Sequence, residues 1–142
     1  MRFSKQAILV VVGFCAAVGR ATSNCRDFRD WESTVSKASP TVKDCEELWT
    51  QLGWDDRLYW TIGDTQYKLA YYGTCYLGGQ RAGHGTSRLG NEDLRHVIRK
   101  SIDDYKYLFD DGIERVGTKG NMTCGDDEVW DRISWGIYHS PK

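Results

Sequence analysis

The segment Leu69–Gly79, with the sequence LAYYGTCYLGG, is the part of the chain around which the predicted fold is arranged. Its residues alternate as in a half-buried strand, with Leu69, Tyr71, Gly73 and Cys75 on one side. The density of tyrosine and cysteine suits a packed, pleated surface. We predict that this segment is the central strand of the sheet and that Cys75 forms a crosslink that holds a helix to it.

Residues 1–21 differ in character from the rest of the chain. Two basic residues precede an apolar run from Ala7 to Val18, and small residues occupy the positions before residue 22. This is the pattern of a secretory signal peptide, and about a dozen apolar residues are fewer than the about 20 that a membrane-spanning helix needs. We therefore expect a signal peptide at 1–21, one secreted, extracellular domain at 22–142, and no membrane insertion.

Charge and size limit the classes of partner. The first 21 residues carry three basic residues and no acid, so their removal moves the formal net charge from −1 to −4. A mildly acidic domain has no electrostatic preference for nucleic acid or for an anionic membrane surface. The remaining length is sufficient for one domain with one hydrophobic core.

Four cysteines belong to the expected domain, at positions 25, 45, 75 and 124, because Cys15 lies in the signal segment. An even number in an oxidising compartment indicates disulfides, and four cysteines allow three pairings between which the sequence does not decide. We favour Cys45–Cys75, which joins a helix to a neighbouring strand, with Cys25–Cys124, which joins the N-terminal segment to the C-terminal hairpin. No two of these cysteines lie closer than 20 residues, so we expect no metal site.

Two amphipathic helices are predicted. The first spans Pro40–Leu52, with Ser39 as its N-cap, and turns Cys45 toward the core. The second begins with Asn91 as its cap and continues its apolar stripe to Phe109, where the sequence DDG ends it.

The other segments are predicted to be strands and connections. A short edge strand lies within Asn24–Val35, and Arg57–Ile62 forms a hairpin with the central strand. Gly78–Gly90 is rich in glycine and poor in apolar residues, which indicates a flexible loop or a loop with a frayed strand inside it. Arg115–Cys124, bent at its glycines, and the alternating segment Asp131–His139 are the last two strands.

The predicted order of elements is therefore β-α-β-β-α-β-β. Two helices at this spacing are too few for a doubly wound parallel sheet. We predict an α+β fold, a two-layer sandwich in which a mostly antiparallel four- to five-stranded sheet carries both helices on one face.

No catalytic set is recognised in the sequence. The three histidines, His84, His96 and His139, are accompanied by no GxSxG, HExxH or paired-Asp motif. Acidic runs such as Asp126–Glu128 are typical of solvated surfaces, and Gly78–Gly90 lacks the strand–loop–helix order of a phosphate-binding loop. We expect no catalytic residue and no cofactor, and a small secreted hydrolase is the less favoured alternative.

Aromatic side chains and one sequon are the candidate surface features. Trp49, Trp60 and Trp135 lie on apolar stripes and are predicted to be core residues. The aromatic residues with fewer constraints, which would anchor a partner if exposed, are Trp54, Tyr72, Tyr76 and Trp130. The tripeptide NMT at 121–123 is an N-glycosylation sequon, which makes Asn121 a candidate glycosylation site.

Several short motifs occur together in one order. They are Ser39-Pro40 with Asp44-Cys45; Tyr72-Gly73-Thr74-Cys75; Gly90-Asn91 with Asp93; Ser101-Ile102; Arg115-Val116-Gly117 with Lys119-Gly120, Met122 and Cys124; and Trp135-Gly136 with Tyr138-His139. Together they resemble the necrosis-inducing factor domain of secreted fungal effectors, the homologues of an extracellular protein from a leaf-mould pathogen. The resemblance spans Cys25 to His139.

The resemblance implies a small extracellular effector, able in some members of the family to trigger host cell death. It also implies a fold similar to that of virally encoded fungal killer toxins, which are α/β sandwiches. We therefore expect a monomeric protein that binds an unidentified host apoplastic or cell-surface protein. The alternative is a killer-toxin-like antimicrobial protein directed against competing fungi.

Overall fold

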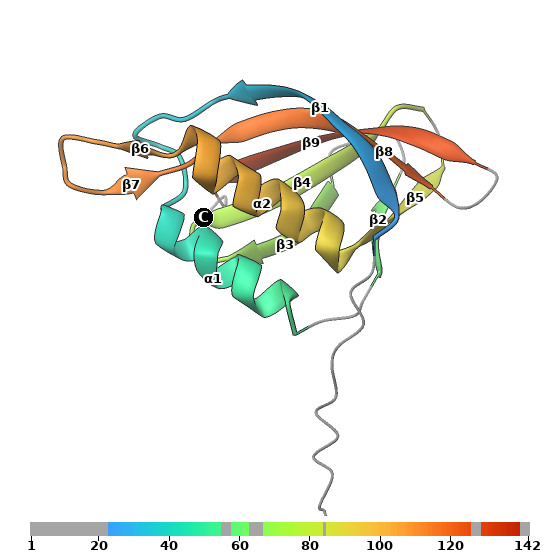
Figure 1. The fold of residues 1–142 in the computed structure, drawn as a ribbon, viewed down its shortest axis with the longest axis horizontal. Helices are drawn as coiled ribbons and strands as arrows, with labels where there is room; N and C mark the ends of the chain where they lie inside the picture. The colour runs from blue at the N-terminus through green and yellow to red at the C-terminus, as the bar shows by residue number, and fades with distance from the viewer. Residues whose placement is uncertain (1–22, 55–57, 63–66, 84, 126–128, 140–142) are drawn as a thin grey trace, which may run out of the picture.

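The computed structural model describes residues 23–54, 58–62, 67–83, 85–125 and 129–139. Figure 1 shows a sheet with both helices against one of its faces. The expected signal segment and His84 lie outside the described residues. Within the described part of the chain, no helix has the length and apolar character needed to cross a membrane.

The main sheet has five antiparallel strands in the order β1-β8-β9-β4-β3. Their bounds are Cys25–Ser33 (β1), Thr118–Gly125 (β8), Trp130–His139 (β9), Cys75–Arg81 (β4) and Tyr67–Tyr72 (β3). The helices are α1 (Val42–Leu52) and α2 (Asn91–Tyr105). Two short strand pairs complete the fold: β2 (Leu58–Ile62) with β5 (Thr86–Gly90), and β6 (Tyr107–Leu108) with β7 (Glu114–Arg115). The predicted fold class, an α+β sandwich with two helices on one face, is confirmed.

The central strand is β9, and its sequence explains why. Ile133, Trp135 and Ile137 are at most 2 % exposed and belong to the core that the helices also form. Ser134 and Tyr138 alternate with them and are exposed. A strand with this period buries one face completely, so the predicted strand Asp131–His139 is confirmed.

The segment Leu69–Gly79 is not one strand, which corrects the prediction. The chain turns at Gly73 and Thr74, so β3 and β4 form a hairpin, and β3 is an edge strand of the sheet. Gly73 has a φ of 51°, a left-handed conformation that residues with a Cβ rarely adopt. Strong β propensity on both sides of the turn concealed it in the sequence.

Two predicted connections also differ from the structure. β2 pairs with β5, so Arg57–Ile62 does not form the expected hairpin with the segment that follows it. Gly78–Gly90 contains more strand than predicted, because its two ends belong to β4 and β5. Gly78 is buried and pairs with Gly136 of β9, where the sheet hydrogen bonds outweigh the low strand propensity of glycine.

Helix α1 starts two residues later than predicted. Its N-cap is Thr41, whose Oγ1 accepts the N–H of Asp44 at 3.2 Å. The hydroxyl of Ser39, the expected cap, instead accepts the N–H of Ser36 at 2.9 Å. The predicted end at Leu52 is confirmed.

Helix α2 begins at Asn91, but a different side chain caps it. The Asp93 carboxylate accepts the backbone N–H of Gly90 at 2.7 Å and also that of Asn24, at 2.7 Å, just before β1. Asn91 Nδ2 donates to the carbonyl of Leu52 at 3.0 Å. These polar contacts connect the start of α2 to the end of α1 and to the start of β1.

The chain after α2 also differs from the prediction. The helix ends at Tyr105 and not at Phe109, because the residues that follow form β6 and pair with β7. Leu108, expected on the buried stripe, is 60 % exposed. The predicted strand Arg115–Cys124 is divided, since β7 ends at Arg115 and β8 begins at Thr118.

Two disulfides join the pairs favoured from the sequence. Cys45–Cys75 connects α1 to β4, and both residues are fully buried. Cys25–Cys124 connects directly opposite residues of β1 and β8, and Cys25 is partly exposed. For sequence separations of 30 and 99 residues, the chain-entropy model gives about 3.7 and about 4.7 kcal/mol of stabilisation. Each value is comparable to the net stability of a small domain.

Hydrogen bonds beside Cys45–Cys75 hold the same two elements together. The Asp44 carboxylate accepts the N–H of Thr74 at 2.8 Å and its hydroxyl at 2.6 Å, while Thr74 Oγ1 accepts the N–H of Thr41 at 3.0 Å. Burial raises the pKa of Asp44, but the hydrogen bonds from Thr74 and Thr41 outweigh it and leave that pKa below its ordinary value. We call these contacts, with the disulfide, the α1–turn clamp.

Gly73→Ala tests the α1–turn clamp. A Cβ at this position would lie 2.6 Å from an Asp44 carboxylate oxygen, at a φ of 51°. We expect the substitution to disrupt the Asp44–Thr74 hydrogen bonds and to lower the free energy of unfolding by about 3 kcal/mol. Gly112→Ala is the control, because its φ is 76° with no atom within 4 Å, and it should cost about 1–2 kcal/mol. Urea unfolding with intact disulfides measures both; equal losses would contradict the clamp.

Selective reduction tests the different burial of the two disulfides. Because Cys45 and Cys75 are fully buried and Cys25 is partly exposed, mild reductant should open Cys25–Cys124 first. Alkylation of the folded protein followed by peptide mapping gives the order of reduction. Alkylation of Cys45 and Cys75 before the other pair would overturn this expectation.

Candidate binding site on the outer face of the sheet

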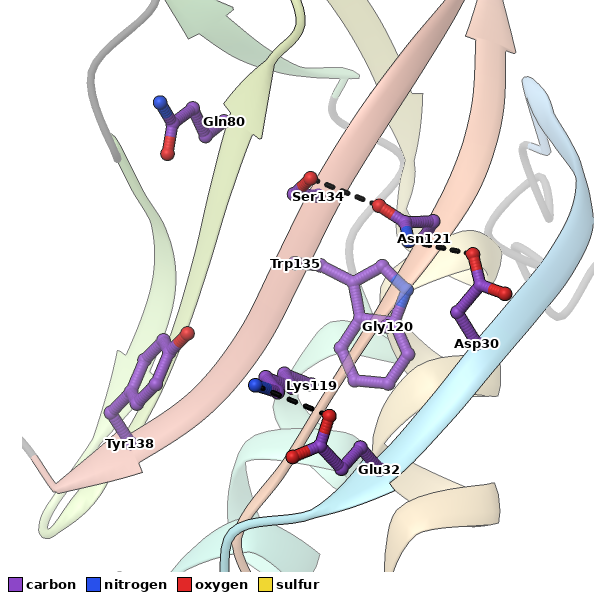
Figure 2. Close-up of a pocket in the computed structure, with 9 residues that line it drawn as sticks. All are labelled: Asp30, Glu32, Gln80, Lys119, Gly120, Asn121, Ser134, Trp135 and Tyr138. Atoms are coloured by element: carbon purple, nitrogen blue, oxygen red, sulfur yellow. Dashed lines mark hydrogen bonds and ion pairs between the residues drawn. The ribbon is translucent and has the colours of Figure 1, made fainter.

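The face of the main sheet that points away from the helices, the outer face, carries mostly polar side chains (Figure 2). Ser134 and Tyr138 of β9 point to it, as do Lys119 and Asn121 of β8 and Gln80 of β4. Each alternates along its strand with residues that face the core, because successive side chains of a strand point to opposite sides.

The strand register arranges these side chains in rows. Asn121, Ser134 and Gln80 lie opposite one another across β8, β9 and β4. The next row consists of Glu32, Lys119, Gly136 and Gly78. A third row contains the opposed pair Tyr138 and Tyr76. Gly136 and Gly78 leave the part of the middle row on β9 and β4 without side chains of its own, between a polar row and an aromatic row.

A hollow of about 360 Å³ lies among these rows (Figure 2). Its polar lining consists of Asp30, Glu32, Gln80, Lys119, Asn121 and Ser134. Tyr138 lines its edge, and the paired residues Gly120 and Trp135 complete the lining. The volume lies within the range of about 300–1,000 Å³ that is typical of small-ligand sites.

A chain of hydrogen bonds crosses three strands of the hollow. Ser134 Oγ donates to Asn121 Oδ1 at 2.9 Å, and Asn121 Nδ2 donates to Asp30 Oδ2 at 2.8 Å. Arg132 Nη2 lies 3.5 Å from the same oxygen of Asp30. These contacts fix the orientation of the Asn121 amide and give the Asp30 carboxylate a cationic neighbour.

Two β-bulges in β1 bring its carboxylates to the hollow. Asp27 and Asp30 have φ values of 54° and 56°, and the register with β8 shifts on both sides of Arg29. Glu32 is thereby placed opposite Lys119, with 3.2 Å between Oε2 and Nζ. Non-glycine residues in the left-handed region are concentrated at functional sites, where the surrounding structure holds them.

The bulges have a sequence signal that the prediction missed. In CRDFRDW, the residues Cys25, Phe28 and Trp31 recur every third position, and these are the residues of β1 that pack on the core. A period of three fits neither a regular strand nor a helix, and each repeat places an Asp at a bulge. The predicted edge strand in this segment is confirmed as β1, but neither Asp30 nor Glu32 is among the site residues predicted from the sequence.

Two aromatic rings cover glycines of the middle strands. A Cβ at Gly120 would lie 2.5 Å from the indole of Trp135, which packs against Trp31 with 4.6 Å between ring centroids. A Cβ at Gly136 would overlap the phenol of Tyr138. The Tyr138 ring therefore lies over the backbone of β9 and provides an apolar surface beside the polar hollow.

Two carboxylates outside the hollow, those of Asp131 and Asp44, accept hydrogen bonds that serve the fold. The hydrogen bond from Arg81, at 2.8 Å, lowers the pKa of Asp131; burial opposes it, and the Ser87 hydroxyl adds to it. The pKa of Asp44 is also lowered, as described above. A general acid needs a carboxyl whose pKa is raised, so these two carboxylates are suited to structural roles.

The two described histidines lie on different elements, His96 on α2 and His139 on β9. His96 of α2 packs against Phe28, with ring centroids 4.5 Å apart, whereas His139 pairs with Cys75 at the end of β9. Among the described residues, no group of three His, Cys, Asp or Glu side chains is arranged to hold a metal ion. That the protein has no catalytic residue stays a prediction.

The expected exposed aromatic residues do not form the site. Trp54, Trp130 and Tyr72 are 85 %, 40 % and 38 % exposed. Tyr76 is half-buried, and burial raises the pKa of its phenol.

The structure describes the side chains of two of the three tryptophans predicted to be core residues. Trp135 is buried, and Trp49 packs on the core with the guanidinium groups of Arg95 and Arg99 over its ring. The side chain of Trp60 lies outside the described residues.

Of the site residues predicted from the sequence, which are Asn121 and the four cysteines, Asn121 lines the hollow. Its amide nitrogen, the atom to which a glycan would be attached, donates to Asp30. Use of the sequon stays a prediction. A glycan on Asn121 would fill part of the hollow.

Gly120→Ala and Gly136→Ala form a matched pair that tests the packing around the site. At Gly120 the added methyl group meets the buried Trp135 ring, which cannot move, so we expect a loss of about 2–3 kcal/mol of unfolding free energy. At Gly136 it meets the end of the Tyr138 side chain, which is 37 % exposed and can turn outward, so we expect about 1 kcal/mol or less. Urea unfolding measures both, and the reverse order would show that the two rings are packed differently.

Comparison with known proteins gives two findings. Over residues 24–124, which include all four half-cystines and both helices, the chain matches the Hce2 family, described as "Pathogen effector; putative necrosis-inducing factor". It is also 33 % identical, over 112 residues, to a "Probable chitinase LysM18" of Penicillium expansum. The match covers 76 % of this chain but 7 % of that protein, so the chain spans a small part of its relative. The chain belongs to the Hce2 family of pathogen effectors.

Proposed function

We propose that the protein is a secreted effector that acts on host plant tissue by binding, and that the hollow on the outer face is its binding site. The observation that carries the proposal is the set of fixed hydrogen-bonding groups that β1, β8, β9 and β4 direct into this hollow. Groups that are already oriented before binding reduce the entropic cost of association. Membership of an effector family supports this role.

The contacts within the hollow argue against covalent catalysis by its residues. Glu32 is paired with Lys119, and Asp30 with Asn121 and Arg132. Covalent catalysis needs a nucleophile and a base within hydrogen-bonding distance. The residues that Figure 2 labels include no such pair.

Extracellular action is part of the proposal. The segment 1–21 has the composition of a signal peptide, and the two disulfides are of the kind that persists in oxidising compartments. The partner is then an apoplastic or cell-surface component of the host, bound by a monomeric domain of residues 22–142.

Paired double variants test the proposal. Lys119→Ala/Gln80→Ala removes two polar groups from the hollow, and Lys43→Ala/Gln51→Ala removes the same two residue types from the exposed side of α1. When purified protein is infiltrated into a panel of host genotypes, we expect the first variant to lose the cell-death response and the second to retain it. Because the Lys119–Glu32 pair is exposed, its loss should change stability by less than about 1 kcal/mol. Equal responses from both folded variants would exclude the hollow as the site.

Assays of the same protein samples distinguish the effector role from the two alternative functions, an antimicrobial protein and a hydrolase. Growth inhibition of competing fungi, without a host response, would favour the antimicrobial role. The relative is named a chitinase, so release of oligomers from chitin is measured as well. Turnover that His139→Ala or His84→Ala abolishes would favour a hydrolase.

A further inference from the structure

We propose that the hollow on the outer face binds a neutral oligosaccharide. This inference rests on the proposed function, since it names the class of ligand that the same site would recognise. Three features support it: the charges of the hollow, its hydrogen-bonding groups and the partly exposed ring of Tyr138.

Each charged group of the hollow has an oppositely charged neighbour, which for Asp30 is Arg132, a residue beside the hollow. The Lys119 ammonium lies 3.2 Å from the Glu32 carboxylate, and the side chains of both residues are about half exposed. Asp30 accepts from Asn121 and has Arg132 at 3.5 Å. An anionic ligand would have to approach two carboxylates, and a cation would have to compete with Lys119 and Arg132. An uncharged polar ligand meets neither penalty.

The polar groups suit a ligand with many hydroxyls. A sugar hydroxyl both donates and accepts a hydrogen bond, and so does the amide of Gln80, whereas the hydroxyl of Ser134 donates to Asn121 and can accept from a ligand. The Glu32 carboxylate and the Lys119 ammonium contact each other and keep further acceptor and donor positions for hydroxyls. Figure 2 shows these side chains around one open hollow on the sheet surface.

Tyr138 provides the apolar part of such a site. Its ring lies over Gly136 and is 37 % exposed, so one face is available at the edge of the hollow. The C–H face of a sugar ring packs on an aromatic ring, and a phenol combines an apolar body with a polar tip.

Two sources share this chemistry: a polysaccharide of a cell wall and a glycan on a host glycoprotein. The experiment below distinguishes them.

Isothermal titration calorimetry of the full secreted chain tests the inference. The protein is made in an oxidising host that does not N-glycosylate, so that Asn121 keeps its free amide. The wall-type probes are chitohexaose, cellohexaose and laminarihexaose; the glycoprotein-type probe is a released high-mannose N-glycan; oligogalacturonate is the anionic control. We expect saturable binding of at least one neutral probe and none of oligogalacturonate.

Variants locate the binding on the molecule. Lys119→Ala/Gln80→Ala and Tyr138→Ala should each weaken binding about tenfold or more, since each removes direct contacts. Tyr138→Phe, which keeps the ring, should lose less, and Lys43→Ala/Gln51→Ala should bind as the unmodified chain does. Backbone amide NMR shifts should change on β8, β9 and β4.

Two results would overturn the inference: no binding of any neutral probe, or equal binding by the Lys119→Ala/Gln80→Ala and control variants. If that double variant loses the host response while no probe binds, the proposed function stands and the oligosaccharide ligand is wrong. If a probe binds in the hollow and the double variant retains the host response, the ligand assignment stands and the proposed function is wrong.

Discussion

The attachment of α1 to the turn between β3 and β4 is the constraint on which the rest of the structure depends. The Cys45–Cys75 disulfide and the hydrogen bonds of Asp44 to Thr74 act within one turn of helix. Gly73 allows the chain to pass close to the Asp44 carboxylate, where a side chain would collide with it. With α1 fixed, its carboxyl end receives the Asn91 amide, and α2 is positioned over the same face of the sheet.

Because both helices pack on one face of the main sheet, the other face is not part of the hydrophobic core. The side chains of β9 and β8 that point outward therefore need not be apolar, and they form the polar rows of the hollow. The bulges of β1 then add two carboxylates at the edge of the sheet, which an unbroken strand with a period of two would not place there. The same bulges make β1 an unsuitable template for pairing with a second chain, because they twist the edge.

The motifs that carried the family resemblance fall into two groups. Most have structural roles: Asp44 and Thr74 in the α1–turn clamp, Asp93 at the start of α2, and Ser101, whose hydroxyl lies 2.7 Å from that of Thr118 in the core. A smaller group, which includes Lys119 and Tyr138, lines the hollow. The short motifs therefore identify the family mainly through the contacts that build its fold, and only part of them describes the surface on which the proposed function depends.

The sequence by itself determined the fold class, the approximate positions of both helices, the strand of Asp131–His139 and an even number of cysteines in the domain, whose pairing it left open. These follow from local periodicity, composition and cysteine count, which a single segment carries on its own. Only the tertiary structure decided that Leu69–Gly79 is a hairpin, that β2 pairs with β5, and that Asp30 and Glu32 face Lys119 and Asn121. Strand partners and bulges depend on contacts between segments far apart in the chain. The free energy of those contacts cannot be inferred from the sequence of one segment.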